Sequence, residues 1–277
     1  MDENHLDLHL ETLQLADEIE LLRDELTRLL TEADELLHIV KPNLLAMYQT
    51  KIGAWEFRLL QLQCEVARLR RQTELAQASI NRGRLPNWTA IEGELELEFL
   101  QWQMKINEAA SRIDAAESRL KNLLTAADSN VLKKLYFSLA KKLHPDVNPQ
   151  LTDDQKRLWL RVQDAYEASD IRELEALALL AERNSQVPQP PATLEILRGQ
   201  RETLKNQIAA MLERLEQIQS RPPFTLRRQL EDDAWVEARR AEIDAQILQW
   251  QTNRDALAAH IATLMKETGH GKQFGNN

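Results

Sequence analysis

Glycine, proline and aromatic residues are scarce in this chain. Its 277 residues include 7 Gly and 9 Pro, and only 5% are aromatic. Long stretches consist instead of Ala, Leu, Glu, Gln, Arg and Lys, the residues that cost least to place in a helix. No run alternates β-branched residues between turns, as strands do. We therefore predict an all-α protein.

Cysteines and long apolar runs are also lacking. The single cysteine, Cys64, excludes an intrachain disulfide and is typical of a reducing compartment. The acidic start MDENHLDLHLE does not have the pattern of a signal peptide. No apolar segment approaches the ~20 residues that cross a bilayer. These absences predict a cytoplasmic protein without a membrane partner.

The chain lacks a basic excess and any catalytic fingerprint. Its net charge is −9, which argues against nucleic-acid binding because a phosphate backbone attracts a basic surface. It has no glycine-rich phosphate loop, nucleophile elbow or cofactor motif. We expect no enzyme activity and no cofactor.

Five segments carry apolar residues at alternating spacings of three and four, the pattern of a coiled-coil seam. These segments are 15–36, 52–80, 95–123, 194–218 and 243–264. We expect the first helix to end near Lys41-Pro42-Asn43, where proline cannot continue the hydrogen bonds, and the second to end at a Gly83 cap. The pattern leaves open whether the seams are filled by the same chain or by another copy.

These segments predict a division of the chain into consecutive regions. They are an N-terminal three-helix coiled-coil region at 1–127, a compact helical piece at 128–183, a proline-rich linker at 184–192, a C-terminal helical hairpin at 193–268 and a flexible tail at 269–277. Long antiparallel coiled-coil helices would then flank a small helical domain.

The compact piece contains the stretch LYFSLAKKLHPDVNPQ, in which a helical pattern stops at a proline. Ser129-Asn130 offers an N-cap. The first helix has the apolar residues Leu132, Leu135, Tyr136, Leu139 and Leu143. Asp153-Asp154 favours the start of a second helix. Its inward residues are Leu158, Trp159, Val162, Ala165 and Tyr166. Two helices with an exposed loop tip are predicted, followed by a short helix within 170–183.

The first of these helices is basic. Residues 131–147 contain four lysines and one acid, a net charge of +3 inside an acidic protein. The lysines are Lys133, Lys134, Lys141 and Lys142. Such a run is either a solvated helix face or a docking surface for an acidic partner. A metal site is not expected, because His144 and Asp146 alone, without a nearby cysteine or further histidine, do not make a tetrahedral set.

About 50 residues of this piece resemble a J domain, the DnaJ-type co-chaperone module. The resemblance rests on Leu132-Lys-Lys-Leu-Tyr136, on Leu139-Ala-Lys-Lys-Leu-His-Pro-Asp-Val-Asn-Pro149 and on Ala165-Tyr-Glu167. The long helices on both sides look like the coiled-coil arms of bacterial J-domain proteins. The resemblance implies arms that bind an unidentified client or a second copy of the chain.

The resemblance also implies a partner and the residues that bind it. In the family, the tip docks on a DnaK-type heat-shock ATPase and stimulates its ATP hydrolysis. The matching tip here is His144, Pro145 and Asp146. The basic docking face would include Lys134, Lys141 and Lys142, and an exposed Phe137 would add an apolar contact.

A second hypothesis is a coiled-coil scaffold or oligomerisation protein whose J-like domain has no co-chaperone activity. Phe137-Ser138 stands where family members usually carry basic residues, and the family's usual first helix is absent. The hypotheses differ over His144→Gln. The co-chaperone hypothesis expects loss of ATPase stimulation without unfolding, because an exposed loop residue contributes little packing. The scaffold hypothesis expects no effect.

Overall fold

The computed structural model describes residues 3–183 and 193–268. Within these ranges the chain consists of helices and turns, with no strand, which confirms the all-α class. None of the helices in these ranges is both long and apolar enough to cross a membrane.

Two compact units divide the chain, and each combines segments far apart in the sequence. Met1–Leu44 and Asn122–Thr225 form the first unit, and Leu45–Lys121 and Leu226–Asn277 form the second. The predicted consecutive regions 1–127 and 193–268 therefore each contribute to both units. The predicted linker and tail, 184–192 and 269–277, lie outside the described residues.

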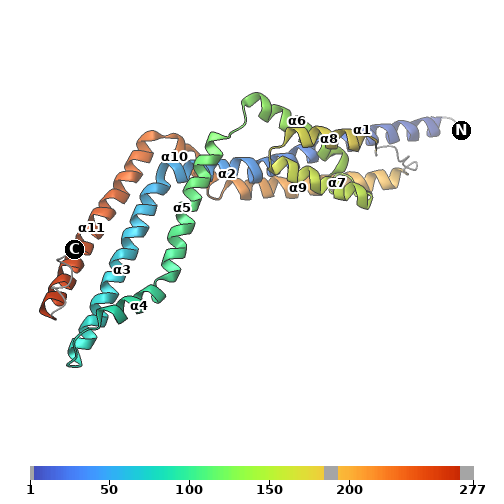
Figure 1. Ribbon diagram of the computed structural model, residues 1–277. Coiled ribbons are helices and arrows are strands. Elements are labelled where there is room, and N and C mark those ends of the chain that lie inside the picture. The colour runs from blue at the N-terminus through green and yellow to red at the C-terminus, as the bar shows by residue number, and fades with distance from the viewer. Residues whose placement is uncertain (1–2, 184–192, 269–277) are drawn as a thin grey trace. The chain divides into compact units, whose positions relative to one another are not determined.

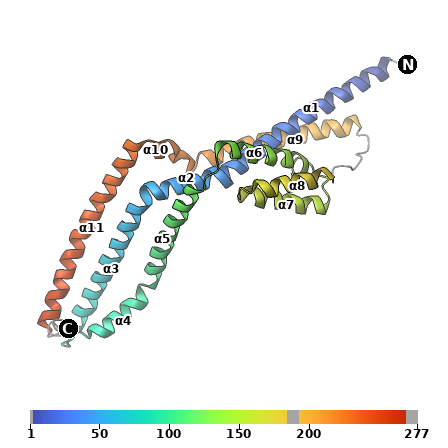
Figure 2. The same cartoon turned by 45° about the horizontal axis from the view of Figure 1, so that its top comes forward.

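In the first unit, α1 (Glu3–Asp34) lies alongside α9 (Leu194–Gln219) (Figures 1 and 2). Apolar residues from both helices form one buried seam. They are Leu15, Ile19, Leu26, Leu29, Leu30, Ala33, Leu197, Leu204, Met211 and Leu215. The apolar seams predicted on these two helices thus pack against each other within one chain.

The direction of this pair follows from the ion pairs along its edge. Arg198 pairs with Glu11, and Lys205 pairs with Glu18 at 2.9 Å. Residue numbers therefore rise together along α1 and α9, so the two helices run parallel and not antiparallel. A parallel pair needs a long connection, which the intervening helices supply.

The first unit also contains three shorter helices, α6 (Ala126–Leu143), α7 (Asp153–Glu167) and α8 (Ile171–Arg183). They share one core. Its buried residues are Leu132, Tyr136, Leu139, Ala140, Leu143, Leu158, Trp159, Val162, Ala165, Tyr166, Leu174, Leu177 and Ala181. The two predicted inward faces and the predicted third helix are confirmed.

The caps of these helices set their limits. The Thr125 side chain accepts a hydrogen bond from the Asp128 amide at 3.1 Å, so α6 begins before the predicted Ser129-Asn130 cap, which is wrong. Thr152 and Gln155 form a reciprocal capping box at the start of α7. This arrangement satisfies two backbone donors that the first turn leaves free.

In the second unit, α3 (Ala54–Asn81) packs against α11 (Asp233–Glu267). Figures 1 and 2 show α3 between α11 and α5 (Leu100–Lys121), with α4 (Trp88–Glu98) before α5. The short elements η3 (Phe224–Leu226) and α10 (Arg227–Glu231) precede α11. Two clusters form the core. The first contains Ile52, Leu62, Leu230, Ile243 and Ile247. The second contains Ala76, Trp88, Ile91, Leu95, Ile261 and Leu264.

This pair is also parallel. Lys51 pairs with Asp233 at 3.2 Å, and Glu65 pairs with Arg254 at 3.8 Å. The predicted C-terminal hairpin at 193–268 is therefore corrected: α9 takes α1 as its partner in one unit, and α11 takes α3 in the other. Each helix is covered by an N-terminal helix that lies far away in the sequence.

The first predicted helix does not end near Lys41-Pro42-Asn43. The backbone stays helical from 3 to 81 through η1 (Glu35–Val40), α2 (Lys41–Tyr48) and η2 (Gln49–Gly53), of which the two η segments are π-helical. The Lys41 amide bonds to the Leu36 carbonyl, five residues back. The wider turn before Pro42 accommodates a residue that has no amide hydrogen to donate.

Side chains from α11 and from η2 itself hold this second π-helical segment. The Arg240 Nε donates to the Lys51 carbonyl at 2.8 Å, and its guanidinium lies over the Trp55 ring, 4.2 Å from the centroid. The Lys51 Nζ donates to the Leu230 carbonyl at 2.8 Å. Gly53 is buried here. The Lys51 carbonyl thus accepts from a charged donor within an irregular turn.

Two further boundaries were predicted in this unit. Gly83 has φ of +71°, a left-handed conformation suited to glycine, and α3 ends just before it as predicted. The third segment, predicted as one helix over 95–123, is broken at Phe99 between α4 and α5.

Candidate partner-binding site at the α6–α7 loop

The His144-Pro145-Asp146 segment directly follows α6. The His144 amide still bonds to the Ala140 carbonyl at 2.9 Å, and its backbone then becomes extended. Proline at the next position prevents another helical turn because it lacks the amide hydrogen. The amides of Val147 and Asn148 both turn back to the His144 carbonyl, at 3.2 and 2.9 Å. The sequence thus closes a tight turn after the helix.

The His144 side chain is buried, with 9% of its surface exposed. Its ring lies edge-on to Trp159, with the centroids 5.0 Å apart, and Nδ1 accepts a hydrogen bond from the Asp146 amide at 3.1 Å. Burial lowers the pKa of His144, while the nearby carboxylates of Asp146 and Asp34 oppose that shift. The expectation that His144 is an exposed tip residue is corrected, because its ring belongs to the packing below the loop.

Pro145 and Asp146 are the exposed residues of the tip. The bond from the Asp146 amide to His144 holds the backbone, and the carboxylate is left on the surface. A carboxylate held on a rigid turn can accept charge-assisted hydrogen bonds from an arginine of another protein. These two residues are the part of the predicted tip that a partner can reach.

An aromatic stack supports the turn from below. The rings of Tyr136 and Tyr166 stack with centroids 3.8 Å apart, and Trp159 lies 5.5 Å from Tyr136. The Tyr136 hydroxyl donates to the Asp34 Oδ2 at 2.7 Å. Burial raises the pKa of Tyr136, and the adjacent Asp34 carboxylate raises it further. The phenol therefore stays a neutral donor to a carboxylate of α1.

The predicted docking residues of α6 lie on neighbouring rows of the helix surface. Lys134 is exposed, and Lys142 is exposed with its Nζ 3.9 Å from the Glu182 carboxylate. The Lys141 side chain is accessible to a similar extent, 41% against 38% for Lys142, and its Nζ lies 2.5 Å from the Asp24 carboxylate of α1. Phe137 is half-buried and not exposed as expected. It falls on the row of helix positions between Lys133 and Lys141.

Three carboxylates contact α6: two from α1 and one from the first residue of η1. We call Asp24, Asp34 and Glu35 the acidic edge. Besides the two contacts already described, Glu35 pairs with Lys133 at 2.6 Å. Residue numbers fall along one helix as they rise along the other, so α1 and α6 are antiparallel here. Sequence reasoning missed the acidic edge, because isolated acids on a long helix give no sign of which distant helix they contact.

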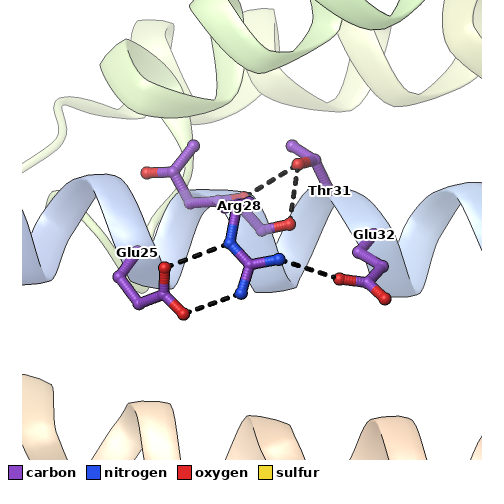
Figure 3. Close-up of polar contacts among 5 residues, drawn as sticks. Glu25, Arg28, Thr31 and Glu32 are labelled. Carbon is purple, nitrogen blue, oxygen red and sulfur yellow. Dashed lines mark hydrogen bonds and ion pairs between the residues drawn. The ribbon is translucent and has the colours of Figure 1, made fainter.

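Other acidic residues of α1, Glu25 and Glu32, form their ion pairs within α1 itself. Figure 3 shows Arg28 between Glu25 and Glu32: its Nη2 donates to Glu25 at 2.7 Å and its Nη1 to Glu32 at 3.3 Å. The Thr31 hydroxyl donates to carbonyls of the same helix. Glu25 and Glu32 are therefore paired within α1, whereas the acidic edge contacts α6.

The loop after the tip is anchored to the seam of α1 and α9. Val147 is 2% exposed and belongs to the buried cluster of that seam. The Asn148 side-chain amide donates to the Lys141 carbonyl at 2.8 Å. Val147 was not predicted as a core residue, since a single valine in a loop carries no periodic signal.

Within the described residues, no three His, Cys, Asp or Glu side chains gather in an arrangement that could hold a metal ion. Comparison of the chain with known protein families, curated proteins and solved structures finds no match. The site is therefore defined by its own geometry: a rigid turn with an exposed carboxylate, beside a basic helix that α1 covers on one side.

Proposed function

We propose that this chain is a cytoplasmic co-chaperone, without catalysis of its own, that binds a DnaK-type heat-shock ATPase and stimulates its ATP hydrolysis. The observation that carries the proposal is the exposed Pro145-Asp146 turn, fixed from below by the buried His144 ring. A rigid turn loses little conformational entropy when it binds, so its carboxylate is ready for a partner arginine.

The basic side of α6 supports the same proposal. Lys134 and Lys142 are exposed on the helix that ends at the tip. In a protein of net charge −9, such a local positive surface steers an acidic partner toward one place. The paired long helices of the two units would hold the client.

Single-turnover ATP hydrolysis by a DnaK-type chaperone tests this function, with the wild-type protein and two matched variants. Asp146→Asn removes the charge at the tip. Asp164→Asn makes the same change on an exposed aspartate in the last turn of α7, at the far end of that helix from the tip. Losing one partner of a charge pair in an interface costs about 2–5 kcal/mol. We expect Asp146→Asn to lower stimulation at least about tenfold and Asp164→Asn to leave it unchanged.

The scaffold hypothesis is favoured by a different observation, the contact of Lys141 with Asp24. A basic helix face that pairs with its own chain is acting as a packing surface. This hypothesis expects no stimulation by the wild-type protein or by any variant in which that contact is broken. It also expects no effect of Asp146→Asn on any property other than local charge.

A further inference from the structure

We propose that the acidic edge of α1 and η1 is an intramolecular competitor that covers part of the partner-binding face of α6. This inference rests on the proposed function, because it concerns access to the same site. Its basis is the three contacts of Asp24, Asp34 and Glu35 with Lys141, Tyr136 and Lys133, at 2.5, 2.7 and 2.6 Å. They extend along α6 from its second turn to its last.

The two lysines that pair with the acidic edge lie on one row of α6 residues. Lys133, Phe137 and Lys141 follow one another at intervals of four and so lie on one row. Both lysines of that row hold carboxylates of the acidic edge, and Phe137 between them is half-buried. Lys134 and Lys142 lie eight residues apart on the neighbouring row. Lys134 is exposed, and Lys142 is 38% accessible with its Nζ 3.9 Å from the Glu182 carboxylate. The acidic edge thus occupies the two lysines of the first row.

The acidic edge presents the same carboxylate groups as an acidic partner protein would. The carboxylates of the acidic edge pair with the two lysines that an acidic partner protein would otherwise bind. The acidic edge and the partner therefore exclude each other from these lysines. Both ion pairs are partly exposed, with side chains 47% and 28% accessible for Lys133 and Glu35 and 41% and 45% for Lys141 and Asp24. Such pairs are weak and sensitive to salt, so a partner can displace them.

The acidic edge can release Lys133 and Lys141 while α1 keeps its place in the protein. The seam with α9 holds α1 through apolar contacts on other positions of the helix. Removing the acidic edge therefore frees the lysine row while α1 stays in place. Competition of this kind lowers the apparent affinity of the partner by the fraction of time that the face is open.

The test compares two double variants with equal loss of charge on neighbouring positions. Asp24→Asn with Glu35→Gln removes the ion pairs to α6. Glu25→Gln with Glu32→Gln is the matched control, because these acids bind Arg28 of α1 (Figure 3). Circular dichroism checks that both variants and the wild type are equally helical. Mass spectrometry then measures the labelling rates of Lys133 and Lys141 by an amine-reactive ester, independently of any chaperone.

We expect the first double variant to raise the labelling of both lysines and to lower the concentration for half-maximal ATPase stimulation. The expected decrease is about 2- to 30-fold, the fold-change that two exposed ion pairs of ordinary strength correspond to. The control variant should match the wild type in both measurements. Stimulation by the first variant but not by the wild type would also support the proposal.

Two outcomes overturn it, and they differ. Equal half-maximal concentrations for all three proteins would refute the competition and leave the proposed function standing. Absence of stimulation by all three proteins, even where labelling shows the lysines to be open, would refute the proposed function and the inference with it.

Discussion

At the scale of single residues, His144 shows how a histidine can belong to a tip without being its contact surface. Its ring packs on Trp159 and accepts the Asp146 amide, so protonation of Nδ1 would break that hydrogen bond in a buried place. Substitution of His144 therefore changes the turn itself. A loss of activity in such a variant would not show whether a partner contact was lost or the turn had changed its conformation. Substitution of Asp146 tests the partner contact more directly.

The lowered pKa of His144 makes stability depend on pH. Below about 6.5, the ordinary histidine pKa, the unfolded chain takes up a proton that the folded chain refuses, so the free energy of unfolding falls as pH decreases. By pH 5.5 this histidine can remove up to about 1.4 kcal/mol.

Urea unfolding of the wild type and of His144→Gln at pH 7.5 and 5.5 measures this loss. We expect a smaller decrease in the variant than in the wild type. His260→Gln is the control, because His260 is exposed on α11. The same decrease in all three proteins would contradict the assignment of a buried, neutral His144.

At the scale of elements, α11 offers neighbouring positions with opposite surroundings. Ile247 is 3% exposed against α3, whereas Leu248 is 65% exposed. An aspartate at 247 loses apolar burial and places a carboxylate in the core, which we expect to cost at least about 3 kcal/mol. The same change at 248 should stay within about 0.5 kcal/mol. Thermal unfolding followed by circular dichroism compares the two variants, and equal destabilisation would argue against the pairing of α3 with α11.

Much at this scale could be predicted from the sequence. The apolar spacings marked the faces of α1, α3, α9 and α11 correctly, because a period of 3.6 is a local signal. Arg201 and Arg254 fall on the seam positions of α9 and α11. Arg201 lies within 3.6 Å of Glu18, and Arg254 within 3.8 Å of Glu65, so each sits where its charge meets the partner helix.

What could not be predicted is which distant surface each helix would meet. The parallel pairings of α1 with α9 and of α3 with α11 depend on contacts across long separations, for which a single sequence carries no periodic sign. The continuation through Pro42 was missed because a π-helical turn removes the conflict that usually ends a helix at proline. The burial of His144 was missed because a polar residue between helices is ordinarily expected at the surface.

At the scale of the whole molecule, the two units have separate buried clusters. The clusters around Leu204 and Tyr136 belong to the first unit, and those around Ile247 and Ala76 belong to the second. A unit with its own core can lose its packing on its own.

Hydrogen exchange with peptide-resolved mass spectrometry tests this separation. In Ile247→Asp we expect faster exchange in peptides of α3 and α11, and wild-type exchange in peptides of α6, α7 and α8. Met211→Asp, which alters the buried seam of α1 and α9, should give faster exchange in peptides of those two helices and leave α3 and α11 protected. Loss of protection in both units after either substitution would show that they unfold as one.

The parallel pairing of α1 with α9 also has a consequence for the making of the protein. About 160 residues separate the end of α1 at Asp34 from the start of α9 at Leu194. At the usual ribosomal speed of about 5–20 residues per second, α1 is complete roughly 8–32 s before its partner begins to emerge. Throughout that interval the nascent chain has not yet made the helix that will cover the apolar stripe of α1.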